Sequence, residues 1–586
     1  MGFNLACIVL TACCGSAQDS EPTHWVEVYD LRSLTASALK VGGGVDMLHP
    51  GGILLGELEP DRPDIVLGDP VWTLTDHELD QLAHDFLAPG PFPDEAKIKV
   101  VAGFLTLDGS AAQHEMTERW THTLYSHLHR MAGYELYRLD RIPPDWSGVL
   151  SAEQVQDWLD ASGEVPDHEV RNPLGVRVLL GARASKALPY DLDVEVAQLE
   201  AVSDPSITRA MDSFELGAVA LETSDGRFFV RQWGVTSTQV GEPRHFQFLE
   251  SVPNFLMLPT IQGTKWTSSG VIEDGGGMVV GHEEGSRGVS LLVIRKERTQ
   301  EPEQDSEGIP IGILTAPPVQ SWASLTRDVS PSGGQVPLEQ EWDELALPAY
   351  QPDGLVSALV EATRAVGAKL DWRLVHAAAF PITDTSAAQI GREWIASWEK
   401  RLARTISIEV RYGYVDSKDW SERRLASANA EDWLDLLGRR VVTQARSGDS
   451  VFVHGTLSTW YLQDYDVQIA QGVSITDPIV ADSETGMKFW CRPRLAPGGK
   501  IQAWTHFGVA AEVAPMEVIE AHFPYAPAEK AIPLVTSGRI ELPNVEIVNE
   551  VQESSLESGR WTPLVVSKMD GLDRVLVAVL RLTADR

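Results

Sequence analysis

Asp191–Gln198 (DLDVEVAQ) returns as Asp464–Gln471 (DYDVQIAQ), at an offset of 273 (464 − 191). Self-similarity at a fixed period is the sequence signature of a repeated structural unit. Four further matches occur in the same order and at nearly the same spacing: Ser110–Gln113 with Ser386–Gln389, Asp145-Trp146 with Asp419-Trp420, Asp157–Asp160 with Asp432–Asp435, and Ser203–Pro205 with Thr476–Pro478. The sequence therefore predicts a tandem duplication, with one unit in each half of the chain.

Each half is predicted to begin with a strand, a helix and a second strand. In the first half, a strand over Val100–Leu107 runs into the turn signal Asp108-Gly109, and the strand after the helix covers Tyr134–Leu139. The apolar residues of the helix recur every four positions along one face: Ala112, Met116, Trp120, Leu124 and Leu128. The second half matches this pattern with Ile390, Trp394, Trp398 and Leu402 in a helix and Ile406–Val410 in a strand.

The later part of each half consists of short β-type runs, such as Ala218–Leu221 and Arg227–Arg231. We therefore expect an α+β fold class. Each of two tandem units would hold a small α/β domain (strand, helix, strand) followed by a mostly antiparallel β domain. The tryptophans of the repeated motifs are expected to anchor the core rather than to bind a ligand: Trp146, Trp158, Trp420 and Trp433.

The stretch between the halves has the composition of a linker. Residues 298–347 include Glu301–Asp305 (EPEQD) and Ser330–Gly334 (SPSGG), and such acidic, Pro-, Gly- and Ser-rich sequence buries little apolar surface. Within it, Ile309–Leu314 (IPIGIL) is a short apolar run that we expect to dock on a neighbouring sheet.

The charge of the chain limits its partners. Its 586 residues include 48 basic and 84 acidic side chains, which gives a formal net charge of −36. So negative a surface repels phosphate backbones and anionic lipid headgroups, so nucleic acid is not an expected partner. With 43% apolar and 23% charged residues, most of the chain is expected to fold, into about three to five domains.

Cysteine usage excludes a disulfide framework in the mature chain. Cys7, Cys13 and Cys14 lie in the first fourteen residues, which leaves Cys491 alone in the folded body. A cysteine-based zinc site is excluded for the same reason. Because Cys491 follows Phe489-Trp490, it is predicted to be a buried, inert thiol.

The N-terminus is predicted to direct export. Phe3–Cys14 is an uncharged, largely apolar run, shorter than the about 20 residues that span a bilayer but long enough for the core of a signal peptide. Leu10–Cys13 (LTAC) resembles a bacterial lipobox, which would make Cys13 a lipidated N-terminus and anchor the protein to a membrane. In the alternative, Gly15–Ala17 precedes an ordinary cleavage before Gln18. No Lys or Arg precedes the run.

Several motifs carry a family resemblance. They are Trp25–Arg32 (WVEVYDLR), Phe104–Ser110 (FLTLDGS), Tyr461–Val467 (YLQDYDV) with Thr476–Pro478, Gly486 and Arg492-Pro493, Leu258-Pro259 with Val271–Gly281 (VIEDGGGMVVG), and Leu542-Pro543 with Ser558-Gly559 and Val575–Leu580. They resemble parts of the bacterial secretins of type II and type III secretion systems. The first two are similar to strands that open such envelope proteins and their small α/β domains, and the others to the secretin β-domain. This chain departs from that family in carrying two such β-domains.

The resemblance and the repeat together predict the domain boundaries. Residues 1–17 form the signal peptide or lipoprotein signal, 24–133 an N-terminal α/β domain, 134–297 a first secretin-like β domain, 298–347 the linker, 348–405 a second α/β domain and 406–586 a second secretin-like β domain. Because secretin units associate side by side into rings, the resemblance also implies self-association and envelope proteins as partners. In the alternative, the two halves form a pseudo-symmetric pair inside one chain.

Three groups of side chains were considered as metal sites. His77, Asp80 and His84 share a helix face, an arrangement that a solvated surface also explains. In His114–Glu118 (HEMTE), Glu118 stands where the zinc-protease helix needs its second histidine, and the nearby histidines follow no helical spacing: His122, His127 and His129. The acids at 191, 193 and 195 share a strand face and could hold calcium, but Gln468 replaces one of them in the second half. We predict no metal site.

The sequence also predicts no catalytic residue and no cofactor. Asp274–Gly277 is not followed by the Gly-Lys-Ser/Thr of a phosphate loop, and we expect a tight hairpin there because glycine supplies the positive φ. We expect a non-enzymatic envelope protein, structural or active in assembly and secretion, in the periplasm or outer membrane of a Gram-negative-type bacterium. The alternatives are a soluble β-rich module that binds a glycan or protein and, third, an enzyme.

Overall fold

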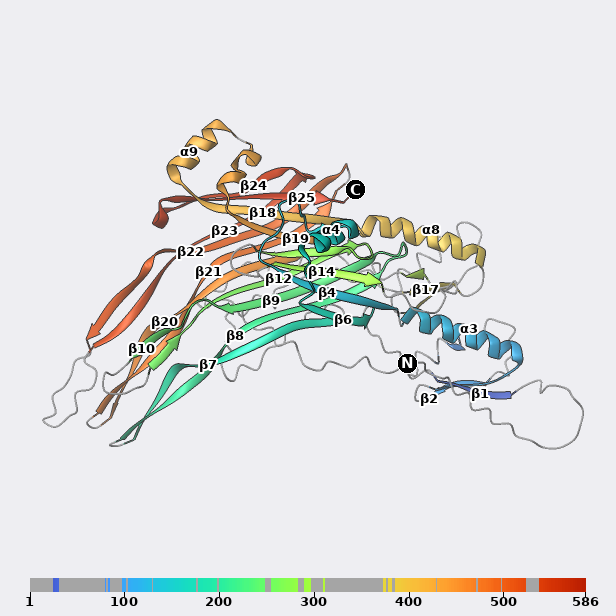
Figure 1. Ribbon diagram of the computed structural model, residues 1–586, viewed down its shortest axis with the longest axis horizontal. Coiled ribbons are helices and arrows are strands. Elements are labelled where there is room, and N and C mark those ends of the chain that lie inside the picture. Colours follow the sequence, from blue (N-terminus) through green and yellow to red (C-terminus); the bar gives the residue numbers. More distant parts are fainter. Residues whose placement is uncertain are drawn as a thin grey trace, which may run out of the picture.

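The computed structural model describes residues 25–30, 80, 83–84, 97–101, 104–128, 130–174, 178–197, 200–247, 255–282, 289–296, 309–310, 372–375, 378–381, 385–427, 429–470, 473–496, 498–522 and 537–585. Its body consists of two large β-sheets packed face to face, with α-helices at their periphery (Figure 1). The long strands of the first sheet run side by side across the molecule, and the helices α3 (Ala111–Leu128) and α8 (Thr385–Leu402) lie at one end of them.

The first sheet contains eight described strands, which follow one another in chain order. They are β7 (Val178–Ala197), β8 (Glu200–Glu222), β9 (Phe228–Gln239), β12 (Thr260–Ile272), β20 (Val451–Ala470), β21 (Val473–Leu495), β22 (Lys500–His522) and β23 (Ser537–Glu557). The longest have 23 residues, which corresponds to about 75 Å at the rise of a strand. The C-terminal half thus continues the sheet that the N-terminal half begins.

The second sheet repeats this division between the halves. Its order is β6 (His168–Pro173), β4 (Met131–Leu139), β14 (Val289–Lys296), β13 (Gly277–His282), β19 (Arg439–Arg446), β18 (Thr405–Asp416), β25 (Arg574–Ala584) and β24 (Trp561–Met569), with β5 (Val149–Leu150) paired to β13. All described strand pairs in the two large sheets are antiparallel.

The core lies between these two sheets. Alternate residues along β20 and β21 point inward, as Val451, Val453 and Phe489 show, and they pack with residues of the other sheet. The ring of Tyr412 on β18 meets that of Phe507 on β22 edge to face, with centroids 5.5 Å apart. Each fully buried large side chain contributes about 1.5–3 kcal/mol.

The two halves share irregular features as well as strand order. A β-bulge between Pro189 and Asp191 in β7 matches one between Leu462 and Asp464 in β20, 273 residues apart (462 − 189). Trp146 packs edge to face on Trp158 at 5.5 Å between centroids, and Trp420 packs on Trp433 in the same manner at 4.9 Å. Trp146, Trp420 and Trp433 are buried and Trp158 is partly buried, so these residues anchor the core as predicted.

The predicted α+β class is wrong, because the described chain is mostly β. The reason lies in the strand that follows each predicted helix. β4 follows α3 but pairs with β14 and β6 in the large sheet, and β18 follows α8 but pairs with β19 and β25. Neither strand returns to the small sheet before its helix, so the described residues form no strand–helix–strand unit.

The small sheets before the helices also differ from the prediction. The run Val100–Leu107 is not one strand: it divides into β2 (Lys97–Val101) and β3 (Phe104–Gly109), which pair antiparallel, with β1 (Trp25–Asp30) on the other side of β3. β15 (Ile309–Pro310) pairs with β17 (Ala378–Pro381), which pairs with β16 (Trp372–Val375). The expected docking of the apolar run at 309–314 is thus confirmed for its first two residues.

The glycine turn at Asp274–Gly277 is not a hairpin. It follows β12 of one sheet and precedes β13 of the other, so it carries the chain from one layer to the next. The positive φ of Gly275, 79°, agrees with the reason given for glycine there. The hairpin β10 (Arg244–Gln247) and β11 (Phe255–Leu258) forms a separate two-stranded sheet.

Short helices cover the outer side of the second sheet. α4 (Ala152–Ser162) begins with a capping box made by Ser151 and Gln154 and ends at Gly163, which has a φ of 66°. In the second half, α9 (Ser417–Ala426) and the 3₁₀ helix η3 (Ala430–Leu436) take a comparable place, with a further 3₁₀ turn, η4 (Asp570–Leu572), before β25.

Candidate functional site

The two halves meet at one junction, which we call the internal seam. β12 pairs with β20 over eight residues on each strand, Thr260–Thr267 against Thr459–Phe452, and the backbone N–H of Trp460 donates to the carbonyl of Pro259 at 3.2 Å. In the second sheet, β13 pairs with β19 through Gly281 and His282. Both layers of the sandwich are therefore continuous from one half to the other.

A buried charged cluster lies at the internal seam. Asp449 is fully buried between two arginines: Arg446 donates to its Oδ1 at 2.8 Å, and the Nη2 of Arg231 lies 3.6 Å from its Oδ2. Burial alone would raise the pKa of Asp449, but Arg446 and Arg231 outweigh it and lower that pKa. Burial also lowers the pKa of Arg231 to about 10. Asp449 is therefore ionised at neutral pH.

The other polar atoms of this cluster fix its geometry. The hydroxyl of Ser269 donates to Asp449 Oδ2 at 2.8 Å and accepts from the backbone N–H of Arg446 at 3.0 Å. The guanidinium groups of Arg446 and Arg231 lie 4.7 and 5.2 Å from the ring centre of Phe229. Because β9, β12 and the segment before β20 each supply a partner, a shift of the strand register would break the cluster.

A second charged group ties the halves together in the other sheet. Glu409 accepts from Arg440 Nε at 2.7 Å, and the same arginine donates to backbone carbonyls of the first half: those of Ile142, Pro143 and Trp146. Burial would raise the pKa of Glu409, but Arg440, Arg581 and Arg411 together lower it. This carboxylate therefore holds its arginines in place as a buried anion.

A histidine also packs at the seam without acting as a base. His282 is buried, its Nε2 lies 2.9 Å from the hydroxyl of Tyr412, and burial lowers its pKa to about 3, with Arg439 acting in the same direction. A Cβ at Gly455 would stand 2.4 Å from its Nδ1, so the strand approaches the ring where only glycine fits. The ring is neutral at physiological pH and serves packing.

α8 docks on the first half through one carboxylate. The Oε2 of Glu399 accepts from the backbone N–H of Ser224 at 3.0 Å and also from its hydroxyl, at the turn between β8 and β9. Glu399 is buried, and burial raises its pKa to about 7 against the opposing hydrogen bonds from Ser224. The contact therefore titrates close to neutral pH.

Four strands end the two sheets. β7 and β6 of the first half and β23 and β24 of the second each pair with only one strand among the described residues. On β23, Ile547 is 64% exposed and Val551 is 38% exposed, and Val566 on β24 is 42% exposed. An edge strand carries a row of backbone donors and acceptors that can pair with another chain, so these edges are candidate interaction surfaces.

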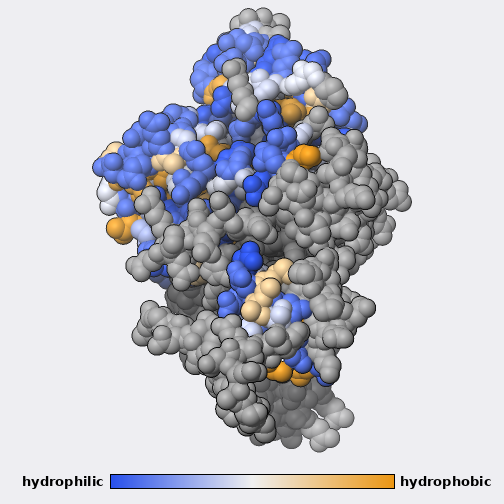
Figure 2. Space-filling view, turned by 90° about the vertical axis from the view of Figure 1, so that its right-hand side faces the viewer, coloured by the Kyte–Doolittle hydropathy of each residue, from blue (hydrophilic) through white to orange (hydrophobic). Residues whose placement is uncertain are grey.

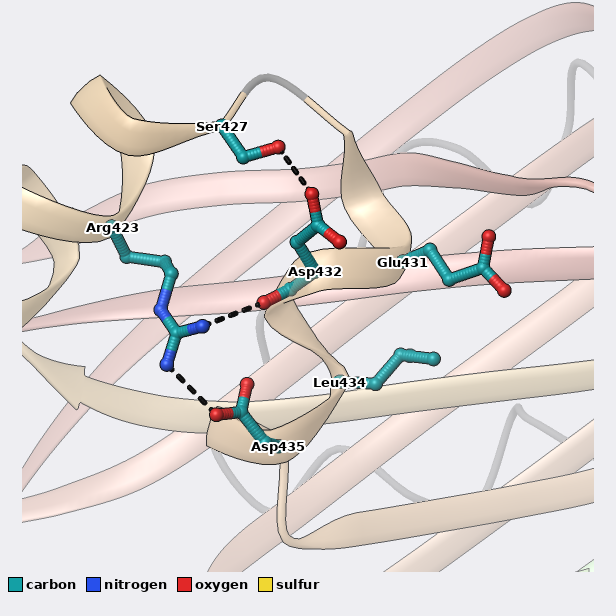
Figure 3. Close-up of a pocket in the computed structure, with 6 residues that line it drawn as sticks. All are labelled: Arg423, Ser427, Glu431, Asp432, Leu434 and Asp435. Carbon is teal, nitrogen blue, oxygen red and sulfur yellow. Dashed lines mark hydrogen bonds and ion pairs between the residues drawn. The ribbon is translucent and has the colours of Figure 1, made fainter.

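A shallow surface depression lies where η3 follows α9 (Figure 3). Arg423 donates to Asp435 Oδ2 at 2.8 Å and to the carbonyl of Asp432 at 3.1 Å, and Ser427 donates to the Asp432 carboxylate. Glu431 and Leu434 extend away from these bonds. The polar groups of the depression thus bind one another and stabilise the turn, which gives no indication of a ligand.

The histidine groups considered as metal sites do not form one in the described part. His77 lies outside the described residues; Asp80 and His84 are 3.8 Å apart, and Asp80 Oδ1 accepts from the backbone N–H of Val100. His114 instead fastens β1 to α3: its Nδ1 lies 2.8 Å from the Tyr29 hydroxyl, and its ring stacks on Trp25 with centroids 4.3 Å apart. Among the described residues, no His, Cys, Asp and Glu side chains converge as a metal site.

The remaining predicted residues are mostly in β7, β20 or the N-terminus. Asp191, Asp193 and Glu195 lie in β7, opposite Ser206, Asp204 and Val202 of β8, and Asp464, Asp466 and Gln468 lie in β20. Cys491 is fully buried, as predicted, and burial raises the pKa of its thiol. Cys13 and the alternative cleavage site lie outside the described residues.

Sequence reasoning missed the charged clusters of the seam. A signal was present: Arg231 interrupts the apolar run Phe228–Val230, and Arg446 and Asp449 flank a Ser-Gly turn just before the apolar start of β20. Charges embedded in strands that are otherwise apolar are buried only when paired. Pattern alone, however, does not reveal which distant residue pairs with them.

The surface agrees with the acidic composition. On the end of the molecule that carries α3 and α8, the described residues are largely hydrophilic, with small separate hydrophobic areas (Figure 2). Among the described residues, no helix has the length and apolar character that crossing a membrane requires.

Comparison with known proteins gives no matching family model and no matching curated protein. Among solved structures, the chain is similar to the InvG secretin domain β-barrel of the Salmonella SPI-1 injectisome, at 10% identity and a TM-score of 0.20, over 41% of this chain and 81% of that one. It is similar to the type II secretin GspD of enteropathogenic Escherichia coli at 11% identity and a TM-score of 0.15, over 41% and 86%. It is also similar to GspD in an ETEC pilotin–secretin complex, at 10% identity and a TM-score of 0.17, over 88% of this chain and 86% of that one.

Proposed function

We propose that this protein is a non-enzymatic structural component of a bacterial envelope that acts in assembly or secretion. It is exported to the periplasm or the outer membrane and contains two tandem copies of a secretin-like β unit, residues 134–297 and 406–586, joined by a linker at 298–347. A helix-containing segment precedes each copy, at 24–133 and 348–405. The observation that carries the proposal is the internal seam, where two units of like order share two continuous sheets.

The proposed duplication has support from sequence and geometry together. Matching bulges stand in β7 and β20, matching tryptophan pairs cover the second sheet in each half, and the strand order of each half is the same in both sheets. The repeated motifs at offsets of 273 to 275 fall on these elements, and the motif at 276 falls at the start of α3 and of α8. A unit that binds a second unit side by side within the chain is suited to forming a larger assembly of continuous β-sheets.

Self-association follows from the same geometry. The internal seam uses one edge of each unit, and the other edge of each is open among the described strands: β7 and β6 on one flank, β23 and β24 on the other. A hydrogen-bonding edge that no described strand pairs with favours contact with another chain. The proposed partners are further copies of this chain and other envelope proteins.

The proposed attachment to the membrane rests on the N-terminus. Cleavage before Cys13 would leave a lipidated cysteine there, and cleavage before Gln18 would release a soluble chain. Mass spectrometry of the N-terminal peptide separates the two, since a lipid adds a defined mass to Cys13. A Cys13→Ser variant should then lose the membrane fraction if the lipid form is correct and keep its distribution if it is not.

The proposed function predicts a discrete oligomer. The mature protein, purified in mild detergent, should elute in size exclusion as a species several times the chain mass of 64.2 kDa by light scattering. A clean monomer over the full concentration range would contradict the assembly role and favour the soluble binding module. Cell fractionation provides the second arm, because a cytoplasmic protein would contradict the envelope proposal whatever its mass.

A further inference from the structure

We propose that β23 of one chain binds β7 of a second copy in the register that the internal seam already uses, with Glu550 opposite Leu180. This inference rests on the proposed self-association and deepens it: it names the two edges, their register and their polarity. The partner is a second copy of this chain, because the pairing of β12 with β20 already joins two such units within one chain.

The register follows from the correspondence between the halves. Leu216 on β8 pairs with Gly234 on β9, and in the second half Phe489 on β21 pairs with Phe507 on β22. β8 therefore corresponds to β21, and β9 to β22, each at an offset of 273 (489 − 216 and 507 − 234). The matched bulges give the same offset for β7 and β20.

β12 and β23 carry a different offset. Gly234 pairs with Trp266, and its counterpart Phe507 pairs with Glu550. Trp266 of β12 therefore corresponds to Glu550 of β23, at an offset of 284 (550 − 266). The repeated dipeptide Leu-Pro, at 258–259 and 542–543, gives the same value independently. The insertion of eleven residues relative to the other strands therefore falls between Phe507 and Leu542.

Applied to the internal seam, these offsets define the intermolecular seam. Trp266 faces Val453 in the internal seam, so Glu550 faces Leu180 between chains (453 − 273 = 180). The eight pairs run from Asn544 opposite Lys186 to Val551 opposite Leu179, and Ile547 stands opposite Arg183. Inward-facing positions meet inward-facing positions, so the side-chain alternation of the sheet continues across the joint.

The contact between chains would provide hydrogen-bond partners for backbone groups along the edges of β23 and β7. Eight paired residues on each strand satisfy the outward-facing backbone donors and acceptors along that stretch of both edges, and the new neighbour covers the exposed side chains of Ile547 and Val551. β24 lies on the same flank as β23, and β6 lies on the same flank as β7. The second sheet can therefore continue across the joint as it does at the internal seam.

The two seams differ in charge. At the places of Arg231 and Ser269 the second half has Trp504 and Glu553, and at the sequence position of Asp449 the first half has Val176. The buried Arg–Asp–Arg cluster is thus confined to the internal seam. The intermolecular seam lacks this charged cluster. When the assembly dissociates, the intermolecular seam therefore opens before the internal seam.

Two edges of different sequence meet in this contact, so the association is head to tail. Such a heterologous interface repeats until the rotation per chain closes a ring, or continues as a filament if it does not. Every chain in the assembly would contribute two units, and seams with and without the charged cluster would alternate around it.

Paired cysteines test the register. In full-length protein carrying Ile547→Cys and Arg183→Cys, mild oxidation should produce dimers and higher multimers on a non-reducing gel, with the linked peptides confirmed by mass spectrometry. The matched control is Ile547→Cys with Leu179→Cys, four residues away on the same face of β7 and about 13 Å farther along the strand. Its linked product should be at least tenfold lower.

The outcomes separate this inference from the proposed function. An oligomer by light scattering without a 547–183 link, or with an equal yield from the control pair, overturns the register and leaves self-association standing. A link formed at monomer mass means that the sheet closes within one chain, and a multimer from Ile547→Cys alone means that two β23 edges meet; either result overturns the head-to-tail contact. A monomer with no link contradicts both proposals.

Discussion

Asp449 is a single residue on which the register of the internal seam depends. It is fully buried, and it neutralises two buried arginines, Arg446 and Arg231. Asp449→Asn keeps the shape but leaves both guanidinium groups uncompensated, which we expect to cost about 3–5 kcal/mol of unfolding free energy. Urea denaturation followed by tryptophan fluorescence measures the loss. The control is Glu557→Gln in the exposed pair with Arg560, which should leave the midpoint unchanged; equal midpoints for both variants would contradict a structural role of the cluster.

At this scale the sequence predicted the residues whose environment is local. Cys491 is buried because it follows the apolar pair Phe489-Trp490 in its strand, and the repeated tryptophans are anchors because they pack in pairs beside the sheet, Trp146 from a turn and Trp158, Trp420 and Trp433 from short helices. Arg231 and Asp449 could not be paired in advance, since they are separated by 218 positions (449 − 231) and belong to different halves. Their contact depends on the strand order, which no local pattern contains.

At the scale of elements, the docking of α8 on the β8–β9 turn should depend on pH. In the folded protein Glu399 has a pKa of about 7, raised by burial from 4.5, so the folded state holds its proton more tightly than the unfolded state. The contribution of this group to stability is therefore present in full at low pH and falls as pH rises from about 4.5 to about 7, by on the order of 2–3 kcal/mol. The difference in thermal midpoint between Glu399→Gln and the original protein should rise over this range and level off above it. A constant difference would contradict the assignment.

Elements were predicted where a single period dominates. α3 and α8 occupy the segments whose apolar residues recur every four positions, and β4, β18 and β25 cover the runs predicted as strands at 134–139, 406–410 and 575–580. Apart from the predicted strand Val100–Leu107, which divides into β2 and β3, the failures concern the pairing partners of elements. Alternation shows which face of a strand is buried but not which strand lies beside it, so β4 was assigned to a small α/β domain although it belongs to the large sheet. The glycine turn at 274–277 was read as a hairpin for the same reason.

At the scale of the whole molecule, the charge placed at position 547 should tune self-association. In the proposed register, Ile547→Arg puts an arginine opposite Arg183, whereas Ile547→Glu puts an opposite charge there; both lose the same exposed apolar side chain. Like charges directly opposite destabilise a strand pair, so we expect the arginine variant to associate about three- to tenfold more weakly than the glutamate variant. Sedimentation of dilution series gives both constants. Equal constants would mean that position 547 does not face Arg183.

The sequence indicated two units but not how they meet. Repeats reveal that a unit occurs twice, and the linker composition separates them, yet the seam arises from pairings such as Thr260 with Thr459 that cross the linker. The offset of 273 on β7 and β8 was already contained in the repeated motifs, and the offset of 284 in the dipeptide Leu-Pro at 258–259 and 542–543. These offsets show which residues of the two halves correspond. They predict which residues pair across a seam only when the neighbouring strand is known.

The long connection between β12 and β20 also determines when the molecule can finish folding. Thr260 must find a partner that is synthesised 199 residues later (459 − 260), and closing so large a loop costs entropy before any hydrogen bond compensates it. Pairings of this separation slow folding and prolong the time during which unpaired edges are accessible. While the second half is still emerging, the first half presents both β7 and β12 to its surroundings. A chaperone that shields β12 until Phe452–Thr459 arrives would therefore raise the yield of the native protein more than one that acts after synthesis is complete.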